Sequence, residues 1–537
     1  MTADGSLVPR MGRAALVVSA GILLSRVLGF LREVVLAAIL GATATGDAYD
    51  AAFVIPDFLF YLVAGGYLSI TFIPILARYL AREDREGGWQ AFTAVFRIVG
   101  LLVGLLTLAA FVFAESLVTV AYERFPDLIA SISGSETGDG LAAEQINQVA
   151  ALTRIALPAQ IFFVLGALFV SVQYTHERFL IPTVAPIVYN LGIIVGGVVM
   201  RDSANPGAGF VWGALAGAFV GHFLIQGWGA ARLGLHWVPA VQWGHPAVKE
   251  YILLSIPLML GQSLVALEEQ LVRVFAQFGD PGSIFALGRA RRLDMLPVGV
   301  IAQAAGVAAY PFLARLAAEH RLRDLTHTLM TAIRYVILAS LGATALLAAL
   351  SQPIVRVALQ RANFTAAATV LTASALVFYS LSITAWGVQQ VYARGFYAKK
   401  QMWTPVLIGT TATIVAIPLM VLLAGGDMLG VAGLALASSI AVTGYAVALA
   451  MVWHRRNGTD EVSGVLSALG RGLVGAVVGG LAGWRVSEAI LAATGPTLGG
   501  SAVAIVAGGL TVGLLYLSLN WLLGSPEIRQ LAGRMSK

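Results

Sequence analysis

The chain of 537 residues contains no cysteine, and Asp, Glu, Lys and Arg together make up only 12% of it. The lack of cysteine excludes disulfide bonds and thiolate chemistry. A soluble protein carries about 25% charged residues, which cover its surface. This chain has too few charges to coat a water-facing globule. The composition therefore excludes a soluble enzyme, a secreted disulfide scaffold and a disordered chain.

Sequence motifs for catalysis are also missing. The seven histidines are scattered along the chain, with no HExxH pair or other metal-ligand spacing. The sequence has no Walker-type glycine-rich loop that could bind the phosphates of a nucleotide. We therefore predict no catalytic residue, no metal site and no bound cofactor, and we expect transport rather than enzymatic activity.

The chain is rich in apolar sequence instead: 58% of its residues are hydrophobic, and its mean hydropathy is +0.83. A helix that spans the hydrocarbon core of a bilayer needs about 20 apolar residues. Such stretches lie at about 14–40, 48–77, 90–114, 147–174, 180–200, 208–230, 250–278, 284–313, 327–350, 365–396, 403–424, 428–453, 466–493 and 499–523. We predict an all-α polytopic membrane protein with about 14 transmembrane helices.

Basic residues predict the orientation, because connections rich in Lys and Arg stay in the cytoplasm. With the N-terminus placed inside, most basic residues of the connections fall on the cytoplasmic side. The longest connection on the other side, about residues 115–146, is acidic. Both termini are therefore expected in the cytoplasm. The net charge of +6 then reflects membrane topology and indicates no nucleic-acid partner.

Two pairs of matching segments indicate an internal repeat. IPILARYLA (73–81) and YPFLARLAA (310–318) share a proline and an arginine at the same places. YTHERFLIP (174–182) and YAKKQMWTP (397–405) share a tyrosine followed by a proline eight residues later. Six predicted helices separate the members of each pair, and an even number restores the same orientation. We therefore expect two pseudo-symmetric six-helix lobes related by an axis along the membrane normal.

The repeat predicts the domain organisation. Residues 1–13 form a cytoplasmic N-terminus, of which 1–10 have the look of a vector-derived remnant with a protease site; residues 14–230 form an N-lobe of helices one to six; residues 231–457 form a C-lobe of helices seven to twelve; and residues 458–537 form helices thirteen and fourteen and a cytoplasmic tail. The first apolar stretch is too long for a cleavable signal peptide.

Several arginines lie inside the predicted helices, where an isolated charge costs about 2.5–3.5 kcal/mol at the bilayer centre. Five of them lie near helix ends or stand alone, and we interpret these as side chains that reach the interface: Arg97, Arg154, Arg334, Arg471 and Arg485. The others lie in the first two helices of a lobe: Arg26 and Arg32 in helix one, Arg273 in helix seven, and Arg289, Arg291 and Arg292 in helix eight. We expect these to border a wet cavity between the lobes.

Internal ion pairing is the alternative explanation for these arginines. The candidate pairs are Arg32 with Glu33 or Asp57, Arg273 with Glu269, and Arg292 with Asp294. Arg26 and at least one arginine of helix eight have no close acid by helical spacing. An excess of guanidinium groups in a cavity suits an anion, and phosphate above all, because the planar fork bonds two oxygens at once. The residues therefore indicate a phosphate-bearing substrate.

Helix seven holds candidates for a coupling or gating site. Glu269 and Arg273 are four residues apart, and a helix-internal pair is the simpler interpretation. Glu268 lies on a different face without a sequence-local partner. A coupling ion, sodium or a proton, could bind there, and the membrane potential is the alternative driving force.

These regions also carry a family resemblance. SRVLGFLREVVLAAILG (25–41), GDAYDAAFVIPDFL (46–59) and FIPILARYL (72–80) resemble the opening of the MurJ (MviN) lipid II flippases, and RRLDMLPVGVIAQA (291–304) and GFYAKKQMWTP (395–405) are similar to later segments of that family. The resemblance covers about residues 14–525. It implies the fold of the multidrug/oligosaccharidyl-lipid/polysaccharide exporter superfamily, with two six-helix lobes, alternating access and two further C-terminal helices.

The resemblance implies roles for single residues. Arg26, Arg32 and Arg292 correspond to functional arginines of the family, Ser25 to the serine beside the first of them, and Asp47 to the acid of a DAF-like motif. These residues would bind the pyrophosphate and the sugar-peptide head group.

The sequence departs from the family pattern in helices two and eight. Well-known members have a paired arginine and an Ala-Glu-Gly where this chain has Phe60, Tyr61 and Ala64-Gly65-Gly66, and the acid expected after Arg292 is replaced by Met295, with Asp294 one residue earlier. Arg289 and Arg291 could supply the missing positive charge.

These observations predict a flippase that moves lipid II from the cytoplasmic to the outer leaflet of the inner membrane for cell-wall synthesis. Two alternatives stay open: a flippase for another polyprenyl-pyrophosphate glycan, of O-antigen or capsule type, and a cation-coupled multidrug exporter of the same fold. The protein is expected to act as a monomer within membrane lipid.

Helices thirteen and fourteen stand outside the repeat. They contain runs of small residues, such as GAVVGGLAG (475–483). Gly and Ala there either allow ordinary close packing or leave a shallow groove for the polyprenyl tail. Because two six-helix lobes can bury their own faces, we expect the core to close without these two helices.

Overall fold

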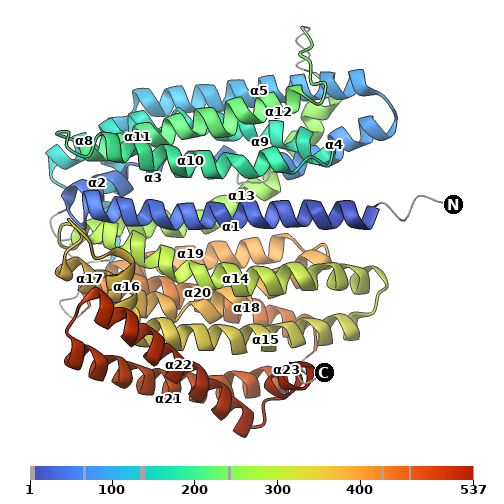
Figure 1. Cartoon of the computed structure of the whole chain (residues 1–537). Coiled ribbons are helices and arrows are strands. Elements are labelled where there is room, and N and C mark those ends of the chain that lie inside the picture. The colour runs from blue at the N-terminus through green and yellow to red at the C-terminus, as the bar shows by residue number, and fades with distance from the viewer. Residues whose placement is uncertain are drawn as a thin grey trace. The chain divides into compact units, whose positions relative to one another are not determined.

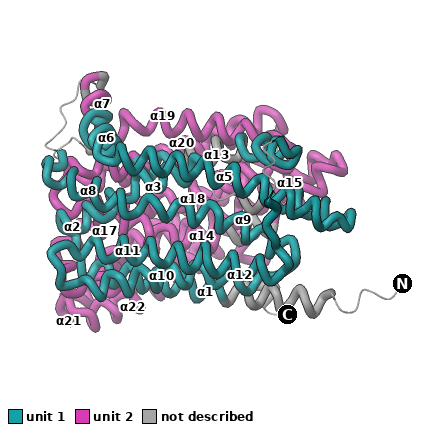
Figure 2. The backbone as a smooth tube through the Cα atoms, turned by 90° about the horizontal axis from the view of Figure 1, so that it is seen from above, with its two compact units in different colours: residues 1–126, 139–270 teal, residues 127–138, 271–537 magenta. Residues whose placement is uncertain are grey.

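The computed structural model describes residues 7–63, 68–133, 140–239, 244–424, 429–458 and 461–535. Within these ranges the chain is almost entirely helical and contains no strand (Figure 1). The predicted all-α class is therefore confirmed. The chain divides into two compact units (Figure 2): unit 1 contains residues 1–126 and 139–270, and unit 2 contains residues 127–138 and 271–537.

Unit 1 is built from the helices of the first half of the chain. They are α1 (Leu7–Leu40), α2 (Ala44–Ala51), α3 (Val54–Val63), α4 (Leu68–Ala81), α5 (Arg85–Val112), α6 (Ala114–Thr119), the π-helix η1 (Val120–Arg124), α8 (Ala143–Ala156), α9 (Ala159–Thr175), α10 (Leu180–Val199), α11 (Pro206–Gly217), the π-helix η2 (Ala218–Leu224) and α12 (Ile225–Ala231). Two helices, α7 (Phe125–Ser133) and α13 (Pro246–Phe275), run across the boundary between the units.

Unit 2 is built from the helices of the second half. They are the 3-10 helix η3 (Ala276–Phe278), α14 (Ser283–Ala318), α15 (Leu322–Ala349), α16 (Ser351–Leu359), α17 (Ala366–Ser380), α18 (Ile383–Ala398), α19 (Trp403–Ala424), α20 (Gly430–Asn457), α21 (Val462–Thr494), α22 (Leu498–Leu522) and α23 (Pro526–Met535).

In the part of the chain that the structure describes, helices lie along each of the predicted membrane spans, and the second span, 48–77, is divided among α2, α3 and α4. Among the described residues, 9 helices are long and apolar enough to cross a membrane, or 10 when α17 and α18, bent by 41° at their junction, count as one span. The helices that fall short of this criterion include α1, α13 and α14, which carry most of the intramembrane charges. The count of 14 is therefore consistent with the structure, and the chain is a multi-pass membrane protein.

The internal repeat appears in the geometry of the turns. Glu83 after α4 and His320 after α14 both have left-handed backbone, with φ of 59° and 57°. In both turns the N–H of the following residue donates to the carbonyl five residues before it, at 3.0 Å. Glu177 after α9 and Lys400 after α18 repeat this pattern, with φ of 57° and 59°. The two matched segment pairs of the sequence therefore fold into the same turns.

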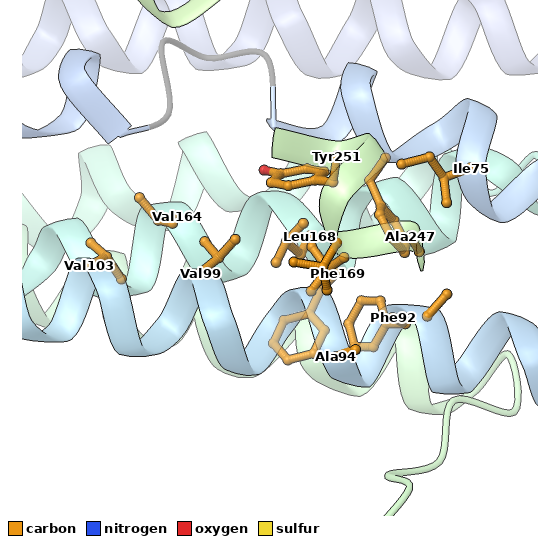
Figure 3. Packing of buried hydrophobic residues seen from close by; sticks show 14 of the residues in the cluster. Ile75, Phe92, Ala94, Val99, Val103, Val164, Leu168, Phe169, Ala247 and Tyr251 are labelled. Carbon is orange, nitrogen blue, oxygen red and sulfur yellow. The ribbon is translucent and has the colours of Figure 1, made fainter. Parts of the chain in front are cut away.

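The core of unit 1 is aromatic and gathers around α5 and α9 (Figure 3). The rings of Phe92 and Phe169 stack with their centroids 6.0 Å apart. Tyr251, near the start of α13, lies edge-on to Phe72 of α4 at 6.3 Å. The first turns of α13 therefore pack into unit 1, although the repeat assigns this helix to the C-lobe. The predicted lobe boundaries themselves stay predictions.

The core of unit 2 includes the two C-terminal membrane helices. Ala476 of α21, and Val512 and Tyr516 of α22, are buried in the same cluster as Ile333 of α15. The hydroxyl of Tyr516 donates to the carbonyl of Leu338 at 2.6 Å. Helices thirteen and fourteen therefore contribute side chains to this core, and the expectation that the core closes without them stays a prediction.

Helices α10 and α11 meet at a seam of glycines. A Cβ added to Gly213 would lie 2.2 Å from the carbonyl oxygen of Gly192, and one added to Gly196 would lie 2.3 Å from that of Gly209. The two backbones are thus in direct contact, as at small-residue interfaces in membranes.

Gly213→Ala is therefore expected to lower the thermal unfolding midpoint, because overpacking a tight interface costs about 1–3 kcal/mol. The matched control is Gly104→Ala in α5, where no described atom lies within 4 Å of the added Cβ. The control should keep or raise the midpoint, since alanine favours helix by about 1 kcal/mol over glycine. Fluorescence-detected unfolding in detergent measures the midpoints of both variants. Equal midpoints would contradict the tight packing of α10 against α11 at these glycines.

Candidate functional site

Arg32 of α1 is held by two side chains of unit 1. Its Nε and Nη2 donate to Glu33 Oε1 at 3.1 and 2.7 Å, and its Nη1 donates to Asn190 Oδ1 of α10 at 2.9 Å. The side chains of Arg32 and Glu33 are 15% and 9% exposed. Of the two acids that the sequence proposed as partners of Arg32, the structure pairs it with Glu33.

Arg26 has a different environment from Arg32. The side chain is exposed, and it makes no ion pair or hydrogen bond with any residue that the structure describes. Ser25, its neighbour, lies on the face of α1 toward α10, where its carbonyl accepts from Asn190 Nδ2 at 3.4 Å. Arg26 is therefore an accessible cation among the described side chains of α1.

Asp47 lies in the first turn of the short helix α2. Thr43 caps this helix, because its hydroxyl accepts from the N–H of Gly46. Asp47 is buried, with 4% of its surface exposed. A carboxylate in the first turn is favoured by the helix dipole, so its position also has a structural explanation.

The three arginines at the start of α14 have three different environments. Arg289 is buried, with its guanidinium carbon 3.9 Å from the ring centroid of Phe285. Arg291 is half-buried, and Arg292 is exposed. Of these three side chains, Arg292 is therefore the most accessible.

Arg291 lies in a polar cluster of unit 2. Its guanidinium lies 5.2 Å from the ring centroid of Tyr379 and 5.1 Å from that of Trp386. Asp294, which is 0% exposed, forms an ion pair with Arg291 at 3.5 Å. The sequence analysis predicted Arg292 as the partner of Asp294. In the structure, Asp294 pairs with Arg291 instead. Met295, at the place of the family's acid, packs in a small apolar cluster.

The candidate coupling residues lie in the last turns of α13. Glu268 is buried, with 7% exposed. Glu269 and Arg273 are half-buried. The structure places them on consecutive turns, as the sequence predicts, and their role in coupling stays a prediction. Among the described residues, no three His, Asp or Glu side chains are arranged to hold a metal ion.

The departure in helix two replaces charge with aromatic packing. The ring of Phe60 lies 6.0 Å from that of Phe163 of α9 and 5.7 Å from that of Tyr61. Residues 64–66 lie outside the described residues. Where related proteins have arginine, this chain therefore packs a ring within unit 1.

Two of the five arginines interpreted as reaching the interface share one buried acid. Arg334 of α15 and Arg471 of α21 lie 3.6 and 3.8 Å from the carboxylate of Glu527 in α23. Glu527 is buried, and Ser525 donates to it at 2.8 Å. These arginines are therefore structural, and they join the C-terminal helix to the bundle. The pairing with a tail residue has no signal in the local sequence.

Unit 2 also contains an apolar cavity of about 760 Å³. Its walls come from α15, α18, α20 and α21, with Leu341, Val388, Val447 and Leu469 among the lining residues. Polar groups gather at one end, where His454 lies beside the exposed Arg455. The cavity has the size and apolar lining of a site for a small apolar ligand.

The glycine run of α21 does not form this cavity. A Cβ on Gly475 would lie 2.5 Å from Asn520, and a Cβ on Gly479 would lie 3.1 Å from the carbonyl of Val512, both in α22. The expected groove at 475–483 is therefore wrong, and ordinary close packing is the correct alternative. The cavity lies along residues such as Leu466 and Leu469, on a different face of α21.

Asn190 is the residue of this region that sequence reasoning missed. The signal was present, because it is an amide near the middle of the apolar stretch LIPTVAPIVYNLGIIVGGVV. A polar side chain at that depth needs a partner.

Comparisons with known proteins agree with the resemblance noted in the sequence. The family model of Lipid II flippase MurJ matches residues 36–498. A curated protein of Vibrio cholerae, "Probable lipid II flippase MurJ", is 28% identical over 501 residues, which cover 90% of this chain and 93% of that protein. "Lipid II flippase MurJ" of Burkholderia cenocepacia is 26% identical over 410 residues, covering 75% of this chain and 76% of that protein.

Solved structures show the same fold. "Lipid II flippase MurJ, inward closed conformation" aligns with a TM-score of 0.72 at 21% identity, over 95% of this chain and 99% of that chain. An inward-facing multidrug resistance MATE family transporter of the MOP superfamily aligns with a TM-score of 0.63 at 14% identity, over 84% of this chain and 99% of that chain. At these identities the likeness concerns the fold alone.

Asp294→Ala is expected to lower the thermal unfolding midpoint, because breaking a buried ion pair costs about 3–5 kcal/mol. Glu319→Ala is the control. The hydrogen bond from Arg315 lowers the pKa of Glu319, but this pair is exposed and contributes little to stability. The thermal unfolding midpoints of both variants are compared with that of the unmodified protein. Equal decreases would show that the Arg291–Asp294 pair contributes no more to stability than a surface pair.

Proposed function

Because the chain belongs to the lipid II flippase MurJ family, we propose that it moves lipid II from the cytoplasmic to the outer leaflet of the inner membrane by alternating access. The family match over residues 36–498 carries this proposal. The site adds a chemical reason, since accessible arginines inside a membrane protein suit a pyrophosphate. The activity is transport, and the residues are binding groups with no covalent chemistry.

In this proposal, arginines bind the head group. Arg26 and Arg292 are exposed and Arg32 is partly exposed. Each can donate two N–H groups to phosphate oxygens. Arg289 and Arg291 are less suited to this role, because Arg289 is buried and Arg291 is engaged by Asp294. The missing arginine of helix two is then not replaced by either of them.

The polyprenyl tail is assigned to the apolar cavity of unit 2. The cavity is walled in part by α21, the predicted helix thirteen, and it is lined almost wholly by carbon. Its polar end carries Arg455, at the end of α20 that the charge distribution places in the cytoplasm. A lipid loaded from the cytoplasmic leaflet would enter from that end.

Arg26→Ala is expected to abolish complementation when this gene is the only flippase in a bacterium, because the exposed guanidinium is lost. Arg26→Lys should restore growth only in part, since a point charge does not reproduce a bidentate fork. Survival and continued cell-wall synthesis are the readouts, at matched membrane expression.

Arg97→Ala is the control for this experiment. Arg97 is half-buried, and its Nη1 donates to the carbonyl of Pro239 at 3.3 Å. This change should leave growth unaffected. Normal growth with Arg26→Ala at wild-type expression would overturn the assignment of Arg26, and no growth with the unmodified gene would overturn the proposed substrate.

Ala450→Phe is expected to weaken binding of full-length lipid II, because the new ring occupies the cavity that Ala450 lines. Binding of a lipid II analogue with a short tail should not change. Val503→Phe on α22 is the control, because Val503 is 53% exposed and does not line the cavity. If Ala450→Phe weakens both ligands equally, or neither, the tail does not occupy this cavity.

Glu268→Gln is expected to change the dependence of flipping on sodium or pH, because a buried carboxylate in a membrane helix suits a coupling ion. Flipping in proteoliposomes with imposed ion gradients measures this dependence. Transport with an unchanged ion dependence would return Glu268 to a structural role and favour the membrane potential as the driving force.

A further inference from the structure

We propose that Asn190 is a positioning residue for the substrate: it fixes the guanidinium of Arg32 so that one N–H on each terminal nitrogen is presented to a phosphate. This inference rests on the proposed function and adds to it a residue of α10, which carries no charge.

The donor count of Arg32 supports the proposal. A guanidinium has five N–H groups, one on Nε and two on each terminal nitrogen. Nε and one N–H of Nη2 go to Glu33, and one N–H of Nη1 goes to Asn190. One N–H is therefore left on Nη1 and one on Nη2, with no acceptor among the described residues. Two N–H groups are what a bidentate phosphate contact requires.

Glu33 alone does not hold this orientation. It contacts only one edge of the guanidinium, through Nε and Nη2. The contact from Nη1 to Asn190 Oδ1 at 2.9 Å holds the other end. An arginine side chain loses conformational entropy when it is fixed, and a guanidinium that is already fixed does not lose this entropy again when the substrate binds.

Asn190 is itself anchored to both helices. Its Nδ2 donates to the carbonyl of Pro186 in α10 at 2.9 Å and to the carbonyl of Ser25 in α1 at 3.4 Å. It is buried, with 6% exposed. A Cβ on Gly29 would lie 3.8 Å from its amide, an ordinary van der Waals distance, so the amide lies close to this part of α1.

The chemistry of an amide suits this position. Oδ1 accepts from Arg32 while Nδ2 donates to a backbone carbonyl. A carboxylate would accept from Arg32 but could not donate to the carbonyls, and it would add a negative charge beside the expected phosphate. An apolar residue would release one end of the guanidinium.

The test is a double-mutant cycle on binding of lipid II to the purified full-length protein. Asn190→Leu is expected to weaken binding about tenfold or more, as for loss of a hydrogen bond to a charged group. In the Arg32→Ala background the same change should have no further effect, because coupled residues are not additive. Arg26 and Arg292 remain to keep that background measurable.

Gln226→Leu is the matched control. Gln226 is also a buried amide of unit 1, and it accepts from Gln173 at 2.8 Å, away from Arg32. This change should lower the unfolding midpoint without changing the affinity for lipid II. If Asn190→Leu does not fold, Asn190→Asp replaces it in the test, because aspartate keeps the volume of the side chain. Asn190→Asp should also weaken the binding of lipid II, and only when Arg32 is present.

The outcomes separate this inference from the proposed function. If Arg32→Ala weakens the binding of lipid II and Asn190→Leu does not, the positioning role of Asn190 is overturned. The assignment of Arg32 to the binding site then still holds. Equal effects of Asn190→Leu with and without Arg32 would reduce Asn190 to a packing residue. No binding of lipid II by the unmodified protein would overturn the function and the inference with it.

Discussion

The cost of placing charge in an apolar interior is the constraint on which the rest of this structure depends. A guanidinium inside a membrane protein must meet a carboxylate, an amide, a ring or water. Arg32 meets Glu33 and Asn190, Arg291 meets Asp294 and two rings, and Arg334 meets Glu527. Each of these contacts joins separate helices or stiffens one, so these charges help to organise the bundle.

The same constraint separates structural arginines from binding arginines. Arg334 is turned to a buried acid and contributes to the attachment of α23. Arg26 is exposed and open to a ligand. Arg32 is between these extremes, because its contacts use part of its hydrogen-bonding capacity and leave two N–H groups. A residue of this kind is stable in the empty protein and still able to bind an anion.

Much of the fold was predictable from the sequence. The apolar stretches predicted where helices lie, and matching segments predicted an internal repeat, which the structure shows in the turns at Glu83 and His320. Arg26, Arg32 and Arg292 were predictable as charges in an apolar context. The partner of Arg291 and the role of Asn190 were not, because helical spacing describes one helix and these contacts depend on which residues of neighbouring helices meet.

The sequence by itself determined the class of the protein, the position of its helices and the chemistry of its arginines, because hydropathy and charge act along the chain. Only the tertiary structure decided that Asp294 pairs with Arg291, that the glycines of α21 pack on α22, and that a cavity opens on another face of that helix. Those outcomes depend on the distances between side chains that are remote in sequence. Helix packing sets these distances, and the local pattern of residues carries no record of them.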